Sequence, residues 1–390
     1  MSGTVIKPPK HMRKQLDIES IRALMPDRPL AESDSETLRA WLADDPQIAS
    51  HVPQQLCQLD PRDGNMVIYN ASRAFRHHDI EEVRTVPEDD GDDCPICDGV
   101  ETRVVDHAPL SEGFTFISQN LYPILYPCQH LSEELLDRPL YPDPERNGRS
   151  TYGMHLLQWT SSIHELDWHN MPLSDLEITV QRLALLEDKL LHTSEGYMPP
   201  CDMQENKFGH VSVIKNFGAP AGASLSHGHQ QISFCNIMPQ RSFHDWSFQR
   251  RHNRTFTNFL LSENPGVLTV ADLGEAQLMV PYFMRRPLHM MLHLKRGGTG
   301  YLHELDQGQL RAMTAGIQLG VKLLRGAMPA LNCVPAFNYA WHIGPGNDLY
   351  VEFFPITQAM GGFERMGMWI CQQRPEDSAA LLKSLIHRVS

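Results

Sequence analysis

Two long amphipathic segments, each followed by a strand–loop–strand pattern, constrain the fold of this chain more than any other feature. The first begins at a capping box, Ser174-Asp175-Leu176-Glu177, in which the serine hydroxyl and the glutamate carboxylate can satisfy each other's free backbone amides. The second covers residues 306–325, and in both segments apolar residues recur at helical spacing and form one face. Strand-like residues 211–235 and 337–355 follow these helices. The pattern predicts an α+β fold built from a duplicated unit, with a boundary near residues 236–245.

The remaining segments complete the expected domain organisation. Residues 1–50 are polar and proline-punctuated, with one short helix expected at residues 35–42, and we interpret them as an N-terminal extension. Residues 51–240 form the expected N-terminal domain, and residues 241–390 form the C-terminal domain. With 390 residues, of which 41% are apolar, the chain is long enough to bury a large core.

Net charge and apolar runs limit the classes of partner. A formal charge of −13 argues against a surface for nucleic acid polymers, which usually bind to basic patches. A pocket for a small phosphorylated substrate is still allowed, because it needs only a few local cations. No run of about 18 apolar residues occurs, and the basic start has no apolar block behind it, so we expect neither a membrane span nor a signal peptide. The expected location is the cytoplasm.

Three polar residues at alternating positions, His227, His229 and Gln231, form the most informative motif of the chain. On a strand, alternate side chains project from the same face, so these three would lie together. Residues 216–224, just before them, are mostly small and would let backbone amides approach a phosphate closely. A neutral imidazole beside such a loop can attack phosphorus and hold a nucleotidyl group covalently, while a glutamine can bind the phosphoryl oxygens. We favour this catalytic interpretation over its alternative, a metal-binding or merely structural histidine pair.

Cys94 and Cys97, in a CxxC motif, form the second constellation. Such a pair offers zinc two thiolates from one tight turn, and a structural zinc site normally has four ligands. The other two must come from elsewhere in the chain, and the candidates are His227 together with His164 or His169. A zinc ion on His227 would hold the strand that presents the next histidine, two residues on. A redox disulfide and a pair of unligated core cysteines are the alternatives.

Two further pairs of residues lie outside these motifs. Arg73 and Arg76 could supply local cations for a phosphate, because guanidinium groups pair well with phosphate oxygens, or they could be solvated surface charges. His289 and His293 lie in a mostly apolar stretch that is typical of a buried strand, so we expect both to be structural.

From about residue 60 to residue 364, these motifs together resemble the galactose-1-phosphate uridylyltransferase branch of the histidine-triad (HIT) superfamily. The most specific similarity is Ala221-Gly222-Ala223-Ser224 followed by His227-Gly228-His229-Gln230-Gln231. The other similar segments are Asp60-Pro61-Arg62-Asp63-Gly64, Ser72-Arg73-Ala74-Phe75-Arg76, Cys94-Pro95-Ile96-Cys97, Asn120-Leu121-Tyr122-Pro123, Asn338, Trp341-His342, Pro355 and Gly362-Phe363-Glu364.

The resemblance implies a fold of two HIT-like half-domains, each an antiparallel sheet with packed helices. It also implies a structural Zn²⁺, whose ligands would be Cys94, Cys97, His169 and His227. His169 stands four residues ahead of the capped helix, as the third ligand does in the family, and His164 is the alternative. His229 would be the nucleophile that becomes nucleotidylated, and Gln231 its phosphate partner. The expected substrate contacts are Arg73, Arg76, Asn120, Asn216, Ser224, Phe363 and Glu364.

The chain departs from the family pattern at several positions. Gly228 stands where a proline often separates the two histidines, which should leave the nucleophile intact but loosen the strand. Ala223 stands where the hexose-specific branch often has cysteine. Relatives acting as nucleotide phosphorylases look similar to this chain at that position. Several members carry a second, iron-type site, but here Tyr350 and Glu352 occupy histidine positions beside His342, so we do not expect this metal to be bound. Galactose therefore cannot be assumed as the sugar.

The resemblance implies a hexose-1-phosphate uridylyltransferase-like enzyme, with carbohydrate and specifically galactose metabolism as the family's setting. It would transfer a nucleotidyl group by double displacement between a nucleotide-sugar and a sugar 1-phosphate, through a nucleotidyl-histidine intermediate. One alternative is a phosphorylase or hydrolase of nucleotide-sugars or dinucleoside polyphosphates on the same scaffold. The other is a catalytically silent, zinc-stabilised nucleotide-binding protein. We also consider a homodimer.

Overall fold

The computed structural model describes most of the chain beyond its first residues. The described residues are 15–43, 45–48, 51, 56–59, 66–68, 94–99, 102–127, 148–151, 153–193, 196–197, 209–235, 238–345 and 348–389.

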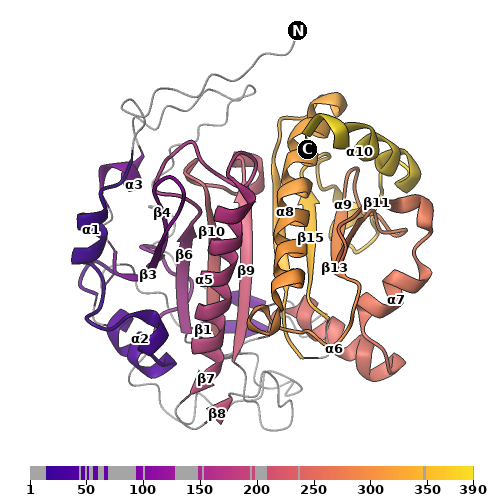
Figure 1. Ribbon diagram of the computed structural model, residues 1–390. Helices are drawn as coiled ribbons and strands as arrows, with labels where there is room; N and C mark the ends of the chain where they lie inside the picture. Colours follow the sequence, from indigo (N-terminus) through magenta and orange to yellow (C-terminus); the bar gives the residue numbers. More distant parts are fainter. Residues whose placement is uncertain are drawn as a thin grey trace.

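A ten-stranded antiparallel sheet forms the centre of the molecule (Figure 1). The strands follow one another across the sheet in the order β11-β12-β13-β15-β14-β9-β10-β6-β4-β3. In chain order they are β3 (Val104–Pro109), β4 (Phe114–Gln119), β6 (Gly153–Trp159), β9 (His210–Phe217), β10 (His229–Cys235), β11 (Thr269–Asp272), β12 (Ala276–Met279), β13 (Met290–Leu294), β14 (Phe337–His342) and β15 (Tyr350–Pro355). Two small sheets also occur, one of β1 (Leu56–Leu59), β2 (Met66–Ile68) and β5 (Gly148–Ser150), the other of β7 (His192–Thr193) and β8 (Gly196–Tyr197).

The large sheet consists of two halves with the same topology. Within the described residues, each half contributes to the large sheet three strands before its long helix and two strands after it, and these five strands lie across the sheet in the order first, second, third, fifth, fourth. The long helices are α5 (Leu173–Leu191) and α8 (Gln307–Ala327). The fourth strands of the two halves, β9 and β14, pair with each other at the centre, where Phe217 is opposite Phe337. The predicted α+β fold with a duplicated sheet-and-helix unit is therefore confirmed.

The two long helices lie in contact on one face of the sheet, α5 over the N-terminal half and α8 over the C-terminal half (Figure 1). Their apolar faces point to the sheet because leucine and other apolar residues recur at helical spacing, as predicted. Asp306 caps α8, since its side chain accepts a hydrogen bond from the backbone N–H of Gln309. Arg311 of α8 pairs with Glu177 of α5 at 3.1 Å, which links the two helices.

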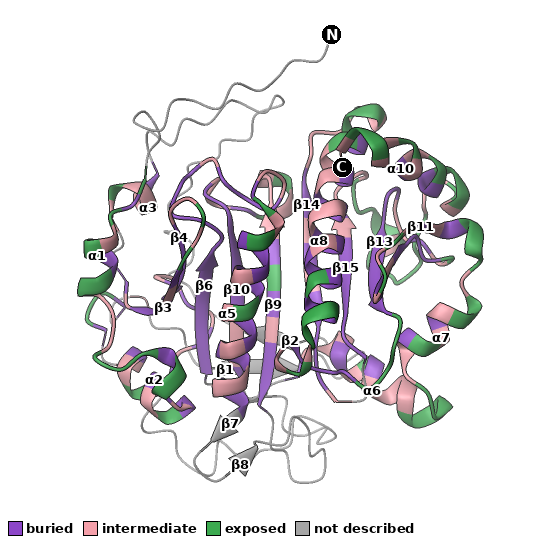
Figure 2. Cartoon of the chain, viewed as in Figure 1, coloured by how far each residue is buried: buried purple, intermediate pink, exposed green. Residues whose placement is uncertain are grey.

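The shorter helices lie at the periphery and in the connections. They are α1 (Ile18–Ala23), α2 (Ser35–Ala43), α3 (Pro95–Asp98), α6 (Gln240–His252), α7 (Phe256–Glu263), α9 (Gly362–Arg365) and α10 (Pro375–Val389). The α2 helix confirms the short helix predicted at residues 35–42, and its Leu38 and Leu42 belong to the main core. Figure 2 shows that β6 is buried along its length, whereas α7 and α10 carry many exposed residues.

One hydrophobic core extends across both halves of the sheet, from Leu176 and Val180 of α5 to Ile317 and Val321 of α8. The halves share this core and one continuous sheet. The domain boundary at residue 240 therefore stays a prediction. In the described part of the chain, no helix combines the length and the apolar character that crossing a lipid bilayer requires.

Candidate active site

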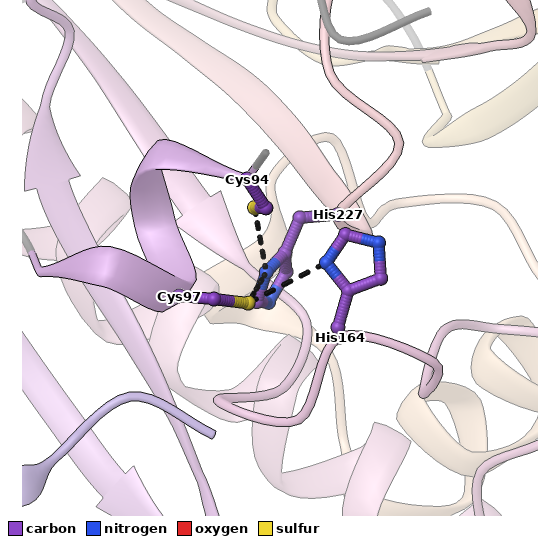
Figure 3. A group of neighbouring side chains, drawn as sticks. All are labelled: Cys94, Cys97, His164 and His227. Carbon is purple, nitrogen blue, oxygen red and sulfur yellow. Dashed lines mark hydrogen bonds between the residues drawn. The ribbon is translucent and has the colours of Figure 1, made fainter. Parts of the chain in front are cut away.

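Four side chains from three separate parts of the chain, Cys94, Cys97, His164 and His227, converge in the N-terminal half (Figure 3). Cys94 precedes the short helix α3 and Cys97 lies within it. The Sγ atoms of Cys94 and Cys97 lie 3.7 Å and 3.6 Å from His227 Nδ1, and Cys97 Sγ lies 3.5 Å from His164 Nδ1. All four ligand atoms lie within 4.8 Å of one another. We name this group the Cys₂His₂ cluster.

The spacing of the cluster suits a tetrahedral ion. Two ligands of a four-coordinate Zn²⁺, with bonds of about 2.0–2.3 Å, stand about 3.3–3.8 Å apart. The cross-cluster distances of 3.5–3.7 Å fall in that interval. The Cys97 thiol and, next, His164 and His227 hydrogen-bond the Cys94 sulfur and lower its pKa against the opposing effect of burial, which favours the thiolate that binds metal.

The outer nitrogens of both histidines already have partners. His227 Nε2–H donates to the carbonyl oxygen of Ser161 at 2.7 Å, and His164 Nε2 lies 3.2 Å from Ser226 Oγ. Each contact leaves the Nδ1 atom directed at the cysteines, which is how metal-bound imidazoles are usually oriented. The residues present therefore fit a structural zinc site.

The structure places His164 in this cluster, and the expectation that His169 is the third ligand is corrected accordingly. After β6 the chain passes the cysteines at His164 and then turns, with the N–H groups of Asn170 and Met171 donating to the carbonyl of Asp167. His169 lies in that turn, outside the cluster, and its buried Nδ1 has no hydrogen-bond partner among the described residues. Distance to the following helix along the sequence could not reveal this path.

His229, the first residue of β10, is 6% exposed and is held in one tautomer. Its Nδ1–H donates to the carbonyl oxygen of His227 at 2.8 Å, so the lone pair of the ring is on Nε2. The ring packs against Trp159 with centroids 4.9 Å apart. Burial and, next, the positive charge of Lys215 lower its pKa to about 4, so the imidazole is neutral at physiological pH. A neutral ring with a free Nε2 lone pair is the form that can attack phosphorus.

Gln231, two residues further along β10, is oriented by His155 of β6. His155 Nδ1 accepts a hydrogen bond from the backbone N–H of Ile124 at 3.1 Å, so its proton is on Nε2. That Nε2–H donates to Gln231 Oε1 at 3.2 Å. The amide NH₂ of Gln231 is then left to donate elsewhere. Asn120 is oriented similarly, because its Oδ1 accepts from the backbone N–H of Tyr122 at 2.9 Å.

These side chains line a cavity of about 300 Å³ beside the Cys₂His₂ cluster. Its lining includes Asn120, Tyr122, Trp159, Ser224, His229 and Gln231. The wall thus combines an imidazole, amide side chains and two aromatic rings, a mixture of polar and apolar groups that suits a small-molecule ligand. Of the predicted substrate contacts, Asn120 and Ser224 lie on this wall.

Asn216 is not among the residues that line this cavity, and its predicted contact with substrate stays a prediction. Its Oδ1 accepts a hydrogen bond from Asn338 Nδ2 at 2.7 Å, and its own Nδ2 donates to the carbonyl of Gly222 at 3.3 Å. Asn338 also donates to the carbonyl of Ala221 at 2.7 Å. The two asparagines therefore hold the small-residue loop against β14, and Asn216 supports the cavity from outside its wall.

Two further predicted substrate contacts, Phe363 and Glu364, do not line this cavity within one chain. Phe363 and Glu364 belong to α9, which lies in the other half of the molecule (Figure 1). Phe363 is 58% exposed. Arg73 and Arg76 fall outside the described residues. A role for Phe363 and Glu364 at this cavity would need a second copy of the chain, and the homodimer stays a prediction.

Three residues near His229 and Gln231 were not singled out from the sequence: His155, Asp167 and Lys215. Each is almost completely buried. The available signal was a polar residue inside an apolar strand, which His155 gives in residues 154–159 and Lys215 gives in residues 211–215.

A second set of buried polar residues lies at the C-terminal half, where a second metal was considered. Tyr350 Oη donates to Asp245 at 2.8 Å, and the His342 ring stacks on the Tyr350 ring with centroids 4.1 Å apart. Glu352 contacts His289 Nε2 at 2.9 Å and His342 Nε2 at 3.1 Å. These groups pair with one another, and burial keeps the Tyr350 pKa well above its ordinary value, so the phenol stays protonated. That no second metal binds in this half stays a prediction from the sequence.

Comparison with known proteins gives the relatives of this architecture. No protein-family model matches the chain. ADP-glucose phosphorylase of Arabidopsis thaliana is 23% identical over 347 residues, covering 84% of this chain and 92% of that protein. A solved uridylyltransferase has a TM-score of 0.63 at 17% identity, over 85% of this chain and 99% of its own. The solved Arabidopsis thaliana ADP-glucose phosphorylase with bound ADP-glucose has a TM-score of 0.56 at 19% identity, over 84% and 98%. These similarities confirm the predicted resemblance to the galactose-1-phosphate uridylyltransferase branch and its fold.

Proposed function

We propose that this chain is a nucleotidyltransferase that works by double displacement through a nucleotidyl group on His229 Nε2. The observation that carries the proposal is the state of that imidazole: neutral, held in the Nδ1–H tautomer by the His227 carbonyl, and part of the wall of a cavity. The similarity to a nucleotide-sugar phosphorylase and to uridylyltransferases supports the same chemistry.

In the first step, His229 Nε2 attacks the α-phosphorus of a nucleoside diphosphate sugar. A phosphorus–nitrogen bond forms, the bond from that phosphorus to the bridging oxygen breaks, and sugar 1-phosphate leaves. Because the attacking nitrogen already has a lone pair, no base has to remove a proton first. The His227 carbonyl then stabilises the positive ring through the same Nδ1–H hydrogen bond.

The amides of Gln231 and Asn120 would donate to the non-bridging oxygens of the transferred phosphoryl group. Positioned donors of this kind contribute most when negative charge develops in the transition state. His155 supports this role for Gln231, since its Nε2–H donates to Gln231 Oε1 and leaves the amide NH₂ directed away from His155.

Zinc would be held by Cys94, Cys97, His164 and His227 and, with four protein ligands, would supply rigidity and folding free energy without an open coordination position. Its effect on the reaction would pass through the short segment from His227 to His229, where β10 begins.

In the second step, an acceptor oxygen attacks the same phosphorus and His229 is released. A sugar 1-phosphate as acceptor gives the uridylyltransferase-like exchange that the sequence predicts. Inorganic phosphate as acceptor gives a phosphorylase, and the name of the Arabidopsis thaliana relative favours this second candidate. The identities of the base, the sugar and the acceptor are part of this proposal and are tested by the experiments below.

The first experiment detects the intermediate. The protein is incubated separately with ADP-glucose and with UDP-glucose, and intact-mass spectrometry measures the mass added. We expect one nucleoside monophosphate on wild type and none on His229→Gly, which should still fold and contain zinc. No adduct with either donor, together with ordinary nucleotide binding by His229→Ala, would favour the silent binding protein instead.

The second experiment identifies the acceptor. The isolated nucleotidyl-protein is chased with inorganic phosphate, with galactose 1-phosphate, with glucose 1-phosphate or with buffer alone. Formation of a nucleoside diphosphate identifies a phosphorylase, formation of a nucleotide-sugar identifies a transferase, and release of the monophosphate in buffer identifies a hydrolase.

A further inference from the structure

The carbonyl oxygen of His229 lies where β10 separates from its neighbour β9. Pairing between these strands runs from Cys235 opposite His210 to Gln231 opposite Ile214, and no further toward His229. Beyond that point β9 continues its pairing with β14 on its other edge. Successive carbonyls of a strand point to opposite edges, and that of Gly228 accepts from the Thr160 N–H on the β6 edge at 2.8 Å. The His229 carbonyl therefore faces the gap on the β9 edge.

Lys215 fills this gap with its side chain. Its Nζ donates to the His229 carbonyl oxygen at 3.0 Å and to Asp167, with Oδ1 at 3.0 Å and Oδ2 at 2.9 Å. Thr160 Oγ1 donates to Asp167 Oδ1 at 3.1 Å. Lys215 is only 1% exposed, so this is a buried ion pair with each charge satisfied.

Stability alone does not account for such a pair. Removing a lysine and an aspartate from water is costly, and a well-packed apolar pair of similar volume is often at least as stable. What the ion pair adds is a directed donor at a defined point of the backbone. That point is the main chain of the nucleophile itself.

The Lys215–Asp167 pair and the Cys₂His₂ cluster hold the two ends of one short segment, from His227 to His229. His164 and Asp167 belong to one loop. His164 is a member of the Cys₂His₂ cluster together with His227, and Asp167 contacts the lysine that binds the His229 carbonyl. Gly228, between the two histidines, leaves room for this loop: a Cβ atom there would lie 2.6 Å from Asp167 Cγ. The absence of a side chain at Gly228 thus provides the space that the carboxylate of the buried ion pair occupies.

We infer that Lys215 and Asp167 form a positioning pair, which sets the direction of the His229 imidazole for attack on the nucleotide. The inference rests on the proposed function. The pair does not touch the reacting atoms and acts through the main chain of residues 228–229.

The test is the double variant Lys215→Met/Asp167→Leu, which removes both charges and leaves no buried charge unpaired. Single-turnover labelling with α-phosphate-labelled ADP-glucose and UDP-glucose gives two quantities for the donor that works on wild type: the fraction of protein labelled, and the rate constant for that fraction. We expect a rate constant about 10–100-fold lower, as misplacement of a reacting group by about 1 Å produces. The donor concentration for half-maximal rate and the zinc content should stay within twofold of wild type.

The matched control is Arg182→Met/Asp106→Leu, which removes another largely buried ion pair of the same half, with Arg182 Nε 2.7 Å from Asp106. This control should change stability and leave the labelling rate constant unchanged. If Lys215→Met/Asp167→Leu labels a smaller fraction but at the wild-type rate constant, the pair is only structural and the inference is overturned. If wild type labels with neither donor, the proposed function fails, and the positioning role fails with it.

Discussion

At the residue scale, Gly228 shows how a local departure from a family pattern becomes intelligible in three dimensions. A side chain at this position would collide with Asp167, whose carboxylate cannot move away because Lys215 and Thr160 hold it. The close packing at Gly228 therefore opposes the loosening that the sequence predicts for a segment without this proline. The adjacent ion pair occupies the space instead and holds the backbone.

Gly228→Ala should accordingly destabilise the protein by about 1–3 kcal/mol, the usual effect of overpacking a filled interior. Urea unfolding followed by tryptophan fluorescence measures this change. Gly266→Ala is the matched control, because a Cβ atom there meets no atom within 4 Å, and it should stay within about 0.5 kcal/mol of wild type. Equal stability of the two variants would show that Asp167 yields easily and that the close packing is unimportant.

What the sequence could predict at this scale was set by local spacing. The CxxC motif and the alternation of His227, His229 and Gln231 depend on neighbours in the chain, and the structure brings each motif to one site. The choice between His164 and His169 depended on the path of a loop, which spacing does not encode. Lys215 and Asp167 are 48 residues apart, and their role depends on the point where two strands separate.

At the element scale, α3 is a four-residue helix that follows one candidate zinc ligand, Cys94, and contains another, Cys97. A helix this short has too few internal hydrogen bonds to be stable alone, so the metal is the expected source of its order. The same metal would connect α3 to the loop after β6 and to the start of β10.

Three single variants test this arrangement through zinc content, measured by atomic emission, and melting temperature. Cys94→Ser and His164→Ala should lose zinc and melt several degrees lower, because metal affinity contributes to folding. His169→Ala should retain zinc, since that side chain lies outside the cluster. Zinc loss in His169→Ala with full occupancy in His164→Ala would reverse the ligand assignment.

The polar set on β14 and β15 gives an expected pH dependence. Burial alone would raise the pKa of Glu352, but hydrogen bonds from His289 and His342 and the charge of Arg241 hold it well below its ordinary value of 4.5. A depressed carboxyl pKa stabilises the fold above the unfolded value, and this contribution is lost as pH falls through the folded pKa.

The difference in unfolding free energy between wild type and Glu352→Gln should therefore shrink as pH is lowered below about 4.5. Above pH 6.5 it should also decline, because the pKa of His342 is raised by Asp245 and Glu352 despite burial, and its contribution disappears as it deprotonates. Urea titrations at pH values from 3.5 to 8.5 measure the difference. A difference in unfolding free energy that does not change with pH would contradict the charges assigned to Glu352 and His342.

At the scale of the whole molecule, the duplication was predictable and the way its halves join was not. Each half repeats a pattern of apolar alternation and an amphipathic helix, which a sequence shows directly. The pairing of β9 with β14 involves two strand edges, and edges carry no periodicity that a sequence could reveal. This central pairing converts two similar units into one ten-stranded sheet with a common core.

A chain of buried hydrogen bonds crosses that junction beneath the candidate site. Tyr339 Oη of β14 donates to Gln230 Oε1 at 3.0 Å, Gln230 Nε2 donates to Gln158 Oε1 at 2.6 Å, and Gln158 Nε2 donates to the carbonyl of Thr179 in α5 at 2.8 Å. Because each group in such a chain depends on its neighbour, the two halves should unfold together.

Tyr339→Phe should lower the unfolding free energy by about 1–3 kcal/mol, because Gln230 Oε1 is left buried without its donor. The unfolding curve should keep one transition, with far-ultraviolet circular dichroism and tryptophan fluorescence coinciding in both wild type and variant. Trp159 and Trp168 report on the N-terminal half and Trp341 on the C-terminal half, so single-tryptophan versions can follow each half separately. Two separated midpoints in wild type would mean that the halves fold independently and that the shared sheet does not couple them.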